Sequence, residues 1–395
     1  MSGFNPQALS NIIWAYATAG ESHPQLFKQL ADHIVAQGDL NGFNSQAFST
    51  ILWAYATAGK SHPRLFNKLS DHIVNLGNLS GFDSQSVANI LWAYASAGET
   101  SPQLFQKFAH HIVAQGDLSE FKPQEISNIL WAYATAGESH PTLFTKLADY
   151  IVAQGDLNAF KPQHEAIARC SEFNPQEVSN IVWACATAGE SHPLLFQKLA
   201  DVAVTRRNDF NPQGVSNLLW AYAVVNVDVP SIFNADSIGV FLKKENDISL
   251  KCFSQLHQWQ LWQKELKSGI RLPPSLRKKS REAFLSQLAN PSRLQDDVIS
   301  VLASIGLQPE EEVLTKSGYR MDALVEANGK KIGIEVDGPS HFVGRKPTGS
   351  TLLKRRQVNT LDAIEVISVP YWEWDKLGNN VAKKQQYLRF ALGLS

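Results

Sequence analysis

A tryptophan recurs at a fixed interval through the first half of the chain, and this spacing is the strongest constraint on the fold. Trp14, Trp53, Trp92 and Trp131 are each 39 residues apart. Each lies in a segment close to F-N-P-Q-x-x-S-N-I-L-W-A-Y-A-T-A-G-E-S-H-P-x-L-F-x-K-L-A-D-H-I-V-A-Q-G-D-L. A period of this length is typical of a stacked array, in which each repeat buries its apolar face only against its neighbours.

Two further copies extend this array. Trp183 follows Trp131 after 52 residues, which is one period of 39 plus a 13-residue insertion at 160–172. Trp220 follows after another 37 residues. We therefore predict an α-solenoid of about six helix-turn-helix repeats over residues 1–230.

The residues that start and end helices recur in each repeat, and they predict two helices. Asn5 stands where a helix N-cap belongs, Pro6 is at the first helical position, and Gly20 suits the left-handed residue that ends a helix. A second helix is expected from His23-Pro24 to Gly38, with an apolar stripe between them. The recurring histidines are interpreted as turn and capping residues: His23, His62, His140 and His192.

A polar stripe runs along the first helix of each repeat. Spacings of 4 and 3 place Gln7, Asn11 and Trp14 on one helical face. Amides beside a large aromatic ring suit nucleic-acid bases, which they bind by hydrogen bonding and stacking. The predicted RNA-binding ladder is Gln7, Asn11, Gln85, Asn89, Gln124, Asn128, Gln176, Asn180, Gln213 and Asn217. The amides could equally bond a neighbouring backbone, and for the tryptophans we favour packing between repeats.

Charge is distributed unevenly along the chain. Residues 1–230 hold 12 Lys+Arg against 19 Asp+Glu, whereas residues 231–395 hold 24 against 18, and the total is −1. If a polyanion binds, the C-terminal part therefore supplies the long-range attraction. No segment has the ~18 consecutive apolar residues of a membrane-spanning helix, and three scattered cysteines do not make a disulfide framework.

Residues 231–290 depart from the repeat and predict a helical connecting region. An amphipathic stretch is followed by a basic run. The predicted phosphate-contacting residues of this run are Arg277, Lys278, Lys279 and Arg281. The alternative is the solvated face of a linker.

Residues 291–395 change to an α/β pattern. Strands are expected at 319–326 and 331–337, because the Asn328-Gly329 pair between them favours a two-residue hairpin. Helices are expected at 296–305 and 380–392, with another strand at 364–369. We expect this segment to fold by itself.

Three short runs give this segment a family resemblance. I-E-V-D-G-P-S-H-F (334–342), G-S-T-L-L-K-R-R (349–356) and V-P-Y-W-E-W (369–374) closely resemble the RAP domain, over roughly residues 331–388. The upstream repeats look like octotricopeptide repeats, and the whole arrangement resembles FAST-kinase-like mitochondrial RNA regulators. Within the match, the predicted RNA-binding residues are His341, Lys354, Arg355 and Arg356.

This resemblance implies a function and a location. We expect an RNA-binding regulator of organellar transcripts, acting on mRNA stability, RNA processing or translation. It would bind single-stranded RNA in a mitochondrion or chloroplast, alongside other RNA-processing proteins and without a membrane partner. A protein-interaction scaffold is an alternative, because the solenoid is acidic and its repeats are nearly identical.

The RAP domain is in turn similar to the restriction-endonuclease-like fold, which implies a second alternative. The matching positions are Asp322 and Glu335, with Asp337 where a lysine usually stands and Lys354 as its substitute. These four would be the catalytic residues of a metal-dependent ribonuclease, and the three carboxylates its Mg²⁺ ligands. Otherwise Glu335 pairs with Arg320 or Lys354, and the domain only binds RNA.

The N-terminus begins directly on a repeat, at Gly3-Phe4-Asn5-Pro6. Neither a signal segment nor a transit peptide is visible before it. We expect either a cytosolic protein or an incomplete N-terminus. The second is favoured because solenoids normally begin with an atypical capping repeat.

Overall fold

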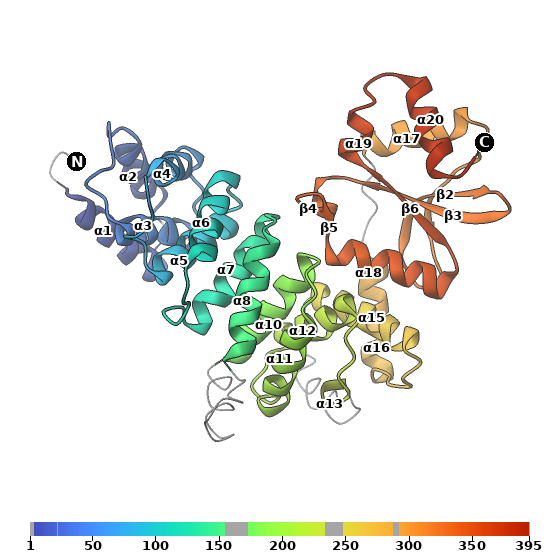
Figure 1. Cartoon of the computed structure of the whole chain (residues 1–395), viewed down its shortest axis with the longest axis horizontal. Helices are drawn as coiled ribbons and strands as arrows, with labels where there is room; N and C mark the ends of the chain where they lie inside the picture. Colours follow the sequence, from blue (N-terminus) through green and yellow to red (C-terminus); the bar gives the residue numbers. More distant parts are fainter. Residues whose placement is uncertain (1–3, 22, 155–172, 234–247, 287–291, 395) are drawn as a thin grey trace. The chain divides into compact units, whose positions relative to one another are not determined.

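The computed structural model (Figure 1) describes residues 4–21, 23–154, 173–233, 248–286 and 292–394. By its internal contacts the chain divides into an N-terminal unit, Met1–Arg206, and a C-terminal unit, Arg207–Ser395. The predicted insertion at 160–172 lies outside the described residues. None of the described helices is long and apolar enough to cross a membrane.

The described residues of the N-terminal unit form five helix pairs, which confirms the predicted helical repeats. The first helices are α1 (Pro6–Thr18), α3 (Ser45–Thr57), α5 (Ser84–Ala97), α7 (Pro123–Ala136) and α10 (Pro175–Thr187). The second helices are α2 (Pro24–Val35), α4 (Pro63–Asn75), α6 (Pro102–Ala114), α8 (Pro141–Ala153) and α11 (Pro193–Thr205). Each first helix packs on the next first helix, and each second helix on the next second helix.

The ends of these helices form as the sequence predicts. Asn5 Oδ1 accepts a hydrogen bond from the Ala8 N–H at 2.7 Å, and Gly20 adopts a φ of +68°. The capping role of the histidines is confirmed, since the Nδ1 atom of His62 accepts the N–H of Leu65 at 3.2 Å. The rings at the equivalent positions do the same: His23, His140 and His192.

A tyrosine fixes the register between neighbouring repeats. The hydroxyl of Tyr94, in the first helix α5, donates to the backbone carbonyl of Phe66 in the preceding second helix, at 2.6 Å. The same bond joins Tyr55 to Phe27 and Tyr133 to Phe105. Because these hydroxyls are buried, each bond penalises any slip of one repeat against the next.

The C-terminal unit begins with a group of helices. Its helices before the sheet are α12 (Pro212–Val225), α13 (Pro230–Phe233), α15 (Leu250–Glu265) and α16 (Pro274–Leu285). Helix α15 packs against α12, and Trp259 lies one 39-residue period after Trp220. The region that the sequence treats as a connection therefore carries a further helix in repeat register.

The rest of the C-terminal unit is an α/β domain, as predicted. Its strands are β1 (Glu310–Leu314), β2 (Arg320–Ala327), β3 (Lys330–Asp337) and β6 (Glu365–Pro370), with the short pair β4 (Phe342–Val343) and β5 (Lys346–Pro347). Its helices are α17 (Arg293–Ser304), α18 (Gly349–Gln357), α19 (Tyr371–Asp375) and α20 (Val381–Ala391), with a 3₁₀ turn at Pro339–His341 and a π turn at Val358–Asp362.

The main sheet has the order β1-β2-β3-β6, with β3 and β6 parallel and the other pairs antiparallel. The predicted hairpin forms at Asn328 and Gly329, whose φ angles are +53° and +73°. One face of the sheet packs on α17, α19 and α20 (Figure 1).

The other face has a core that extends beyond the strands. There Tyr319, Met321 and Leu324 pack against Leu261 of α15 and Phe284 of α16. Two hydrogen bonds join the same parts, from Gln258 Nε2 to the Tyr319 hydroxyl at 3.0 Å and between His257 Nε2 and the Ser317 carbonyl at 3.0 Å. Part of the core of the α/β domain therefore lies upstream of the predicted boundary at 291.

Candidate nucleic-acid interface

The polar stripe of the N-terminal unit faces solvent at its amide positions. Gln85 and Gln124 are exposed, and Asn89 and Asn128 are half-buried. Among the other predicted members of this unit, Gln7, Asn11 and Gln176 are exposed, and Asn180 is half-buried. The helices thus bring these amides together as a row of accessible groups.

The tryptophans of the stripe are intermediate between core and surface. Trp14 is 48% exposed at the start of the array, and Trp53, Trp92, Trp131 and Trp183 are half-buried. A side chain in this state packs against its helix neighbours and still presents part of its ring. The packing role that we favoured from the sequence therefore accounts for only part of each ring surface.

In the last repeat the stripe is covered. Asn217 is only 8% exposed, and its Oδ1 accepts a hydrogen bond from Gln255 of α15 at 3.1 Å. Trp220 is 5% exposed and donates through Nε1 to Gln258 at 2.9 Å. Asn217 is thus removed from the predicted ladder because α15 packs on its face, while Gln213 stays exposed.

The lysines of the repeats are used to cap helices. Lys107 Nζ donates to the Val74 carbonyl at 2.6 Å and to the Leu76 carbonyl, at the C-terminal end of the preceding second helix. Lys68, Lys146 and Lys198 make the equivalent bonds. Carbonyls at this end lack helical partners and carry partial negative charge, so a lysine stabilises them. These charges are therefore engaged within the fold.

A basic basin lies in the C-terminal unit, between the end of α15, the start of α16 and the β1–β2 loop. It has a volume of about 770 Å³. Its basic lining residues are Lys264, Lys267, Arg271, Arg277, Lys278, Arg281 and Lys316. Among the described residues, no acidic side chain lines it. The sequence singled out Arg277, Lys278 and Arg281, while Lys279 is on α16 but does not line the basin.

The carboxylates singled out in the α/β domain are all engaged by the protein. Asp322 Oδ2 accepts the backbone N–H of Val336 at 2.7 Å, beyond the last register pair of β2 and β3, Ala323 and Ile334. Burial raises the pKa of Asp322, and this hydrogen bond partly opposes the rise. Asp322 thus supplies a hydrogen-bond acceptor where the backbone hydrogen bonds between β2 and β3 end.

Glu335 is almost fully buried against α18. It is 3% exposed, and its Oε2 lies 2.5 Å from Lys354 Nζ. Within the described structure, its Oε1 has no hydrogen-bond partner. Burial raises the pKa of Glu335 to about 7, although Lys354 acts in the opposite direction. The predicted alternative in which Glu335 pairs with Lys354 is confirmed.

Asp337 is held by three polar side chains. Its Oδ2 is 2.5 Å from Arg355 Nη2 and accepts the hydroxyl of Ser368, and its Oδ1 is 3.0 Å from His341 Nδ1. Burial by itself would raise the pKa of Asp337, but His341, Ser368 and Arg355 together lower it. The contact with Asp337 in turn raises the pKa of His341.

Arg356, which the sequence places in the same basic run as Lys354 and Arg355, serves a different purpose. Its guanidinium donates to the carbonyls of Ala223 and Val224 at the end of α12, the latter at 3.0 Å, and lies 3.4 Å from Glu265 Oε2. It therefore ties α18 to the helical part of the C-terminal unit.

The predicted Mg²⁺ ligands do not fit a metal ion in this arrangement. Mg²⁺ needs several oxygen atoms directed at one point, whereas Asp322, Glu335 and Asp337 each direct an oxygen at a protein donor. Within the described residues, no group of three or more His, Cys, Asp or Glu side chains could hold a metal ion.

Comparison with known proteins identifies the C-terminal part of the chain and one relative. Residues 334–390 match the RAP domain. Over 124 residues the chain is 32% identical to a RAP domain-containing protein, chloroplastic, of Oryza sativa subsp. japonica. That match covers 31% of this chain and only 18% of the rice protein.

The helical part matches a second family model. The model described as RNA-editing substrate-binding complex 6 protein matches residues 2–160 and, overlapping, 48–268. The second of these matches alone covers more than half of the chain. With its repeats matched over that length, and a RAP domain after them, the chain belongs to the RNA-editing substrate-binding complex 6 protein family.

Proposed function

We propose that this chain is a single-stranded RNA-binding regulator of organellar transcripts, and that the basic basin holds the phosphate backbone. The basin carries the proposal because its described lining has seven Lys and Arg side chains and no acidic one. Phosphate contacts of this kind release condensed counterions and give most of the affinity for a nucleic acid.

The salt dependence of RNA binding tests the basin. Each phosphate contact to a single strand contributes about 0.7 to the slope of log K against log salt. Changing Arg277 and Arg281 to Gln should therefore weaken binding to a labelled RNA and lower the magnitude of that slope by about 1.4. Fluorescence anisotropy across a salt series measures both quantities.

A matched control removes the same charge elsewhere in the unit. Lys376 and Lys383 are exposed and do not line the basin. The variant Lys376→Gln/Lys383→Gln should keep the wild-type slope. Equal slopes for the two double variants, or RNA binding without salt dependence, would remove the basin from the proposal.

We further propose that the exposed amides of the N-terminal unit read bases. The row formed by Asn89, Asn128 and their equivalents lies beside partly exposed indole rings, which suits stacked bases with hydrogen-bonded edges. The near-identity of the repeats then predicts a preference for repetitive or low-complexity RNA. With one base for each of the five described repeats of this unit, the tract would be about five nucleotides long.

Alanine at two amide positions tests this row. Asn89→Ala/Asn128→Ala should relax the preference among homopolymeric RNAs, because the groups that distinguish bases are lost. Stability should change by less than about 1 kcal/mol in total, since each side chain is half-buried and off the core. A large fall in melting temperature would instead assign these amides to packing between repeats.

We assign binding, and not cleavage, to the RAP domain. The side chains implied for a metal-dependent ribonuclease are engaged in contacts within the protein. Glu335 pairs with Lys354, and Asp322 accepts the Val336 N–H. Asp337 is bound by Arg355 and Ser368. We keep the restriction-endonuclease-like type as a proposal for this domain. Its support is a sheet in which β3, carrying Glu335 and Asp337, lies between β2 and β6.

The setting of this activity is also a proposal. The family description refers to RNA editing and to a substrate-binding complex, which supports RNA as ligand and other RNA-processing proteins as partners. The rice relative is described as chloroplastic, which supports an organelle, either a chloroplast or a mitochondrion. Within it we propose a role in mRNA stability, RNA processing or translation.

A further inference from the structure

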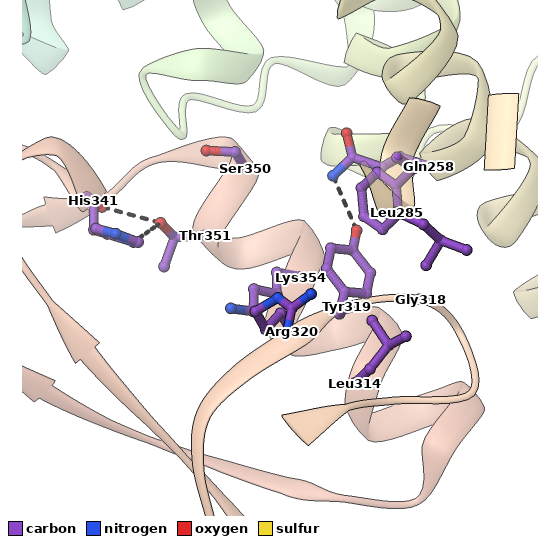
Figure 2. Close-up of a pocket in the computed structure, with 11 residues that line it drawn as sticks. Gln258, Leu285, Leu314, Gly318, Tyr319, Arg320, His341, Ser350, Thr351 and Lys354 are labelled. Atoms are coloured by element: carbon purple, nitrogen blue, oxygen red, sulfur yellow. Dashed lines mark hydrogen bonds between the residues drawn. The ribbon is translucent and has the colours of Figure 1, made fainter. Parts of the chain in front are cut away.

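A second cavity of the C-terminal unit lies on the other side of the β1–β2 loop from the basic basin. It has a volume of about 400 Å³ and is drawn in Figure 2. Three cationic or titratable side chains from different elements line it: Arg320 of β2, His341 of the 3₁₀ turn and Lys354 of α18. None of the carboxylates described above is among its lining residues.

The polar wall of the cavity offers donors to an anion. Figure 2 shows Lys354 and Arg320 between His341 and Thr351 on one side and Tyr319 on the other. The hydroxyl of Ser350 and that of Thr351 add to this wall. Lys354 has three N–H donors, of which one faces Glu335. The Arg320 guanidinium has five, of which one bonds the Glu312 carbonyl at 3.2 Å, and its Nε lies 3.9 Å from the Glu312 carboxylate. Both can bind an oxyanion while keeping these contacts.

The opposite wall is apolar. Phe284 and Leu285 of α16 and Leu314 of β1 line it, and Gln258 and the Tyr319 hydroxyl are joined to each other at its edge. A cavity with cations on one wall and flat or branched apolar groups on the other suits a ligand with an anionic end and a heterocyclic body. Its volume is within the range of small-ligand pockets.

We propose that this cavity binds one nucleotide that carries a terminal phosphate, with the phosphate against Arg320, His341 and Lys354 and the base against Phe284, Leu285 and Leu314. A phosphomonoester offers three terminal oxygen atoms to the donors of these side chains, whereas a phosphodiester offers only two. This inference does not depend on RNA binding by the basin.

A free nucleoside monophosphate and the phosphorylated end of an RNA strand present the same chemistry. Helix α16 lines both the cavity, through Phe284 and Leu285, and the basic basin, through Arg277 and Arg281. An RNA whose backbone lies in the basin could therefore place its end in the cavity. The experiment must therefore test both free nucleoside monophosphates and RNA strands with phosphorylated ends.

Direct titration of the full chain tests the cavity. Equilibrium dialysis with labelled adenosine and uridine 5′-monophosphates should show saturable binding, and the unphosphorylated nucleosides should bind at least about tenfold more weakly. Inorganic phosphate should compete only at much higher concentration, because it cannot contact the apolar wall. Equal binding of nucleoside and monophosphate, or equal competition by phosphate, overturns the proposal.

Two substitutions place a carboxylate on the cavity wall without disturbing the core. Leu314 is 50% exposed, so Leu314→Glu costs little packing. The second substitution is Ser350→Glu. Ser350 is exposed in the first turn of α18, where a carboxylate stabilises the helix. Each variant should weaken nucleotide binding at least about tenfold through charge repulsion.

Leu352→Glu is the matched control, because Leu352 is 41% exposed on the same helix and does not line the cavity. It should bind as the wild type does. If all three variants lose binding equally, the effect is one of net charge and the proposal fails.

A comparison of short RNAs with a 5′-phosphate, a 3′-phosphate or hydroxyl ends then distinguishes a free nucleotide from an RNA end as the ligand. Tighter binding of one phosphorylated end assigns the cavity to RNA termini.

Discussion

A fragment of residues 292–395 is expected not to fold into a stable domain, whereas a fragment of residues 207–395 should fold cooperatively. The shorter fragment lacks α15 and α16, whose Leu261 and Phe284 cover one face of the sheet. Removing them exposes parts of five side chains that this core buries: Tyr319, Met321, Leu324, Val358 and Ile364.

The expected loss is large compared with the stability of a small domain. Full burial of such a side chain contributes about 1.5–3 kcal/mol, so losing half of it at five positions costs about 4–8 kcal/mol. The whole free energy of unfolding of a domain is about 5–15 kcal/mol. Hydrogen bonds to Ser317 and Tyr319 from α15 are lost as well.

Backbone amide NMR and calorimetry distinguish the outcomes. The 292–395 fragment should give poorly dispersed spectra and no cooperative melting, and it should bind a hydrophobic dye. The 207–395 fragment is the control, because it keeps α12, α15 and α16 with the sheet. Well-dispersed spectra and a sharp transition from residues 292–395 alone would show that the RAP domain is independent, as its sequence suggests.

The parts of the fold that the sequence predicts well are those specified by local chemistry. Asn5 and Pro6 start a helix whatever lies beside it, and the Asn328-Gly329 pair has the positive φ angles that its hairpin requires. The 39-residue period of tryptophans determines the helix pairs in the same way. Such signals depend on neighbours in sequence and need no tertiary information.

The parts that the sequence misses depend on contacts between distant segments. Residues 231–290 lack the F-N-P-Q and W-A-Y-A letters, so the sequence does not predict that α15 packs on α12 as one first helix packs on the next. The signal that was available is Trp259, one period after Trp220. Which face of the sheet α15 and α16 cover has no local signature at all.

The basic run on α18 illustrates why site residues are harder to predict than elements. Lys354, Arg355 and Arg356 are adjacent in sequence, and we grouped them as one RNA-binding patch. In the structure they diverge, because adjacent helix positions point in different directions: Lys354 contacts Glu335, Arg355 contacts Asp337, and Arg356 bonds the end of α12. The basin, conversely, gathers Lys264, Lys267 and Lys316 from segments that no run connects.

Replacing Lys354 by Met should destabilise the protein strongly at pH 8 and much less at pH 5. Glu335 has a side chain that is only 4% exposed, and within the described part of the chain its carboxylate pairs with Lys354. Removing one partner of a buried ion pair typically costs about 3–5 kcal/mol, because the remaining charge is left without compensation. At pH 5 the carboxyl is protonated, so this cost largely disappears.

In the wild-type protein, Glu335 should make the free energy of unfolding depend on pH, but less strongly than in the Lys354→Met variant. Its pKa is raised from 4.5 to about 7 in the folded state. The folded state therefore holds this proton more tightly than the unfolded state, and the contribution of Glu335 to stability falls as pH rises from about 4.5 to above 7. The fall amounts to about 3 kcal/mol. Glu335→Gln should remove it, so that this variant gains stability relative to the wild type between pH 5 and pH 8.

Chemical denaturation of the single and double variants at both pH values measures these effects. Lys354→Met/Glu335→Gln should recover most of the stability that Lys354→Met loses at pH 8, because no buried charge remains. The matched control is Lys28→Met, which removes the same side chain from an exposed pair with Asp32 at 2.8 Å and should cost less than about 1 kcal/mol. If Lys354→Met costs no more than Lys28→Met, or costs the same at both pH values, then Glu335 is not held as a buried charge by Lys354. The carboxylate would in that case be free for the metal chemistry that the restriction-endonuclease resemblance implies.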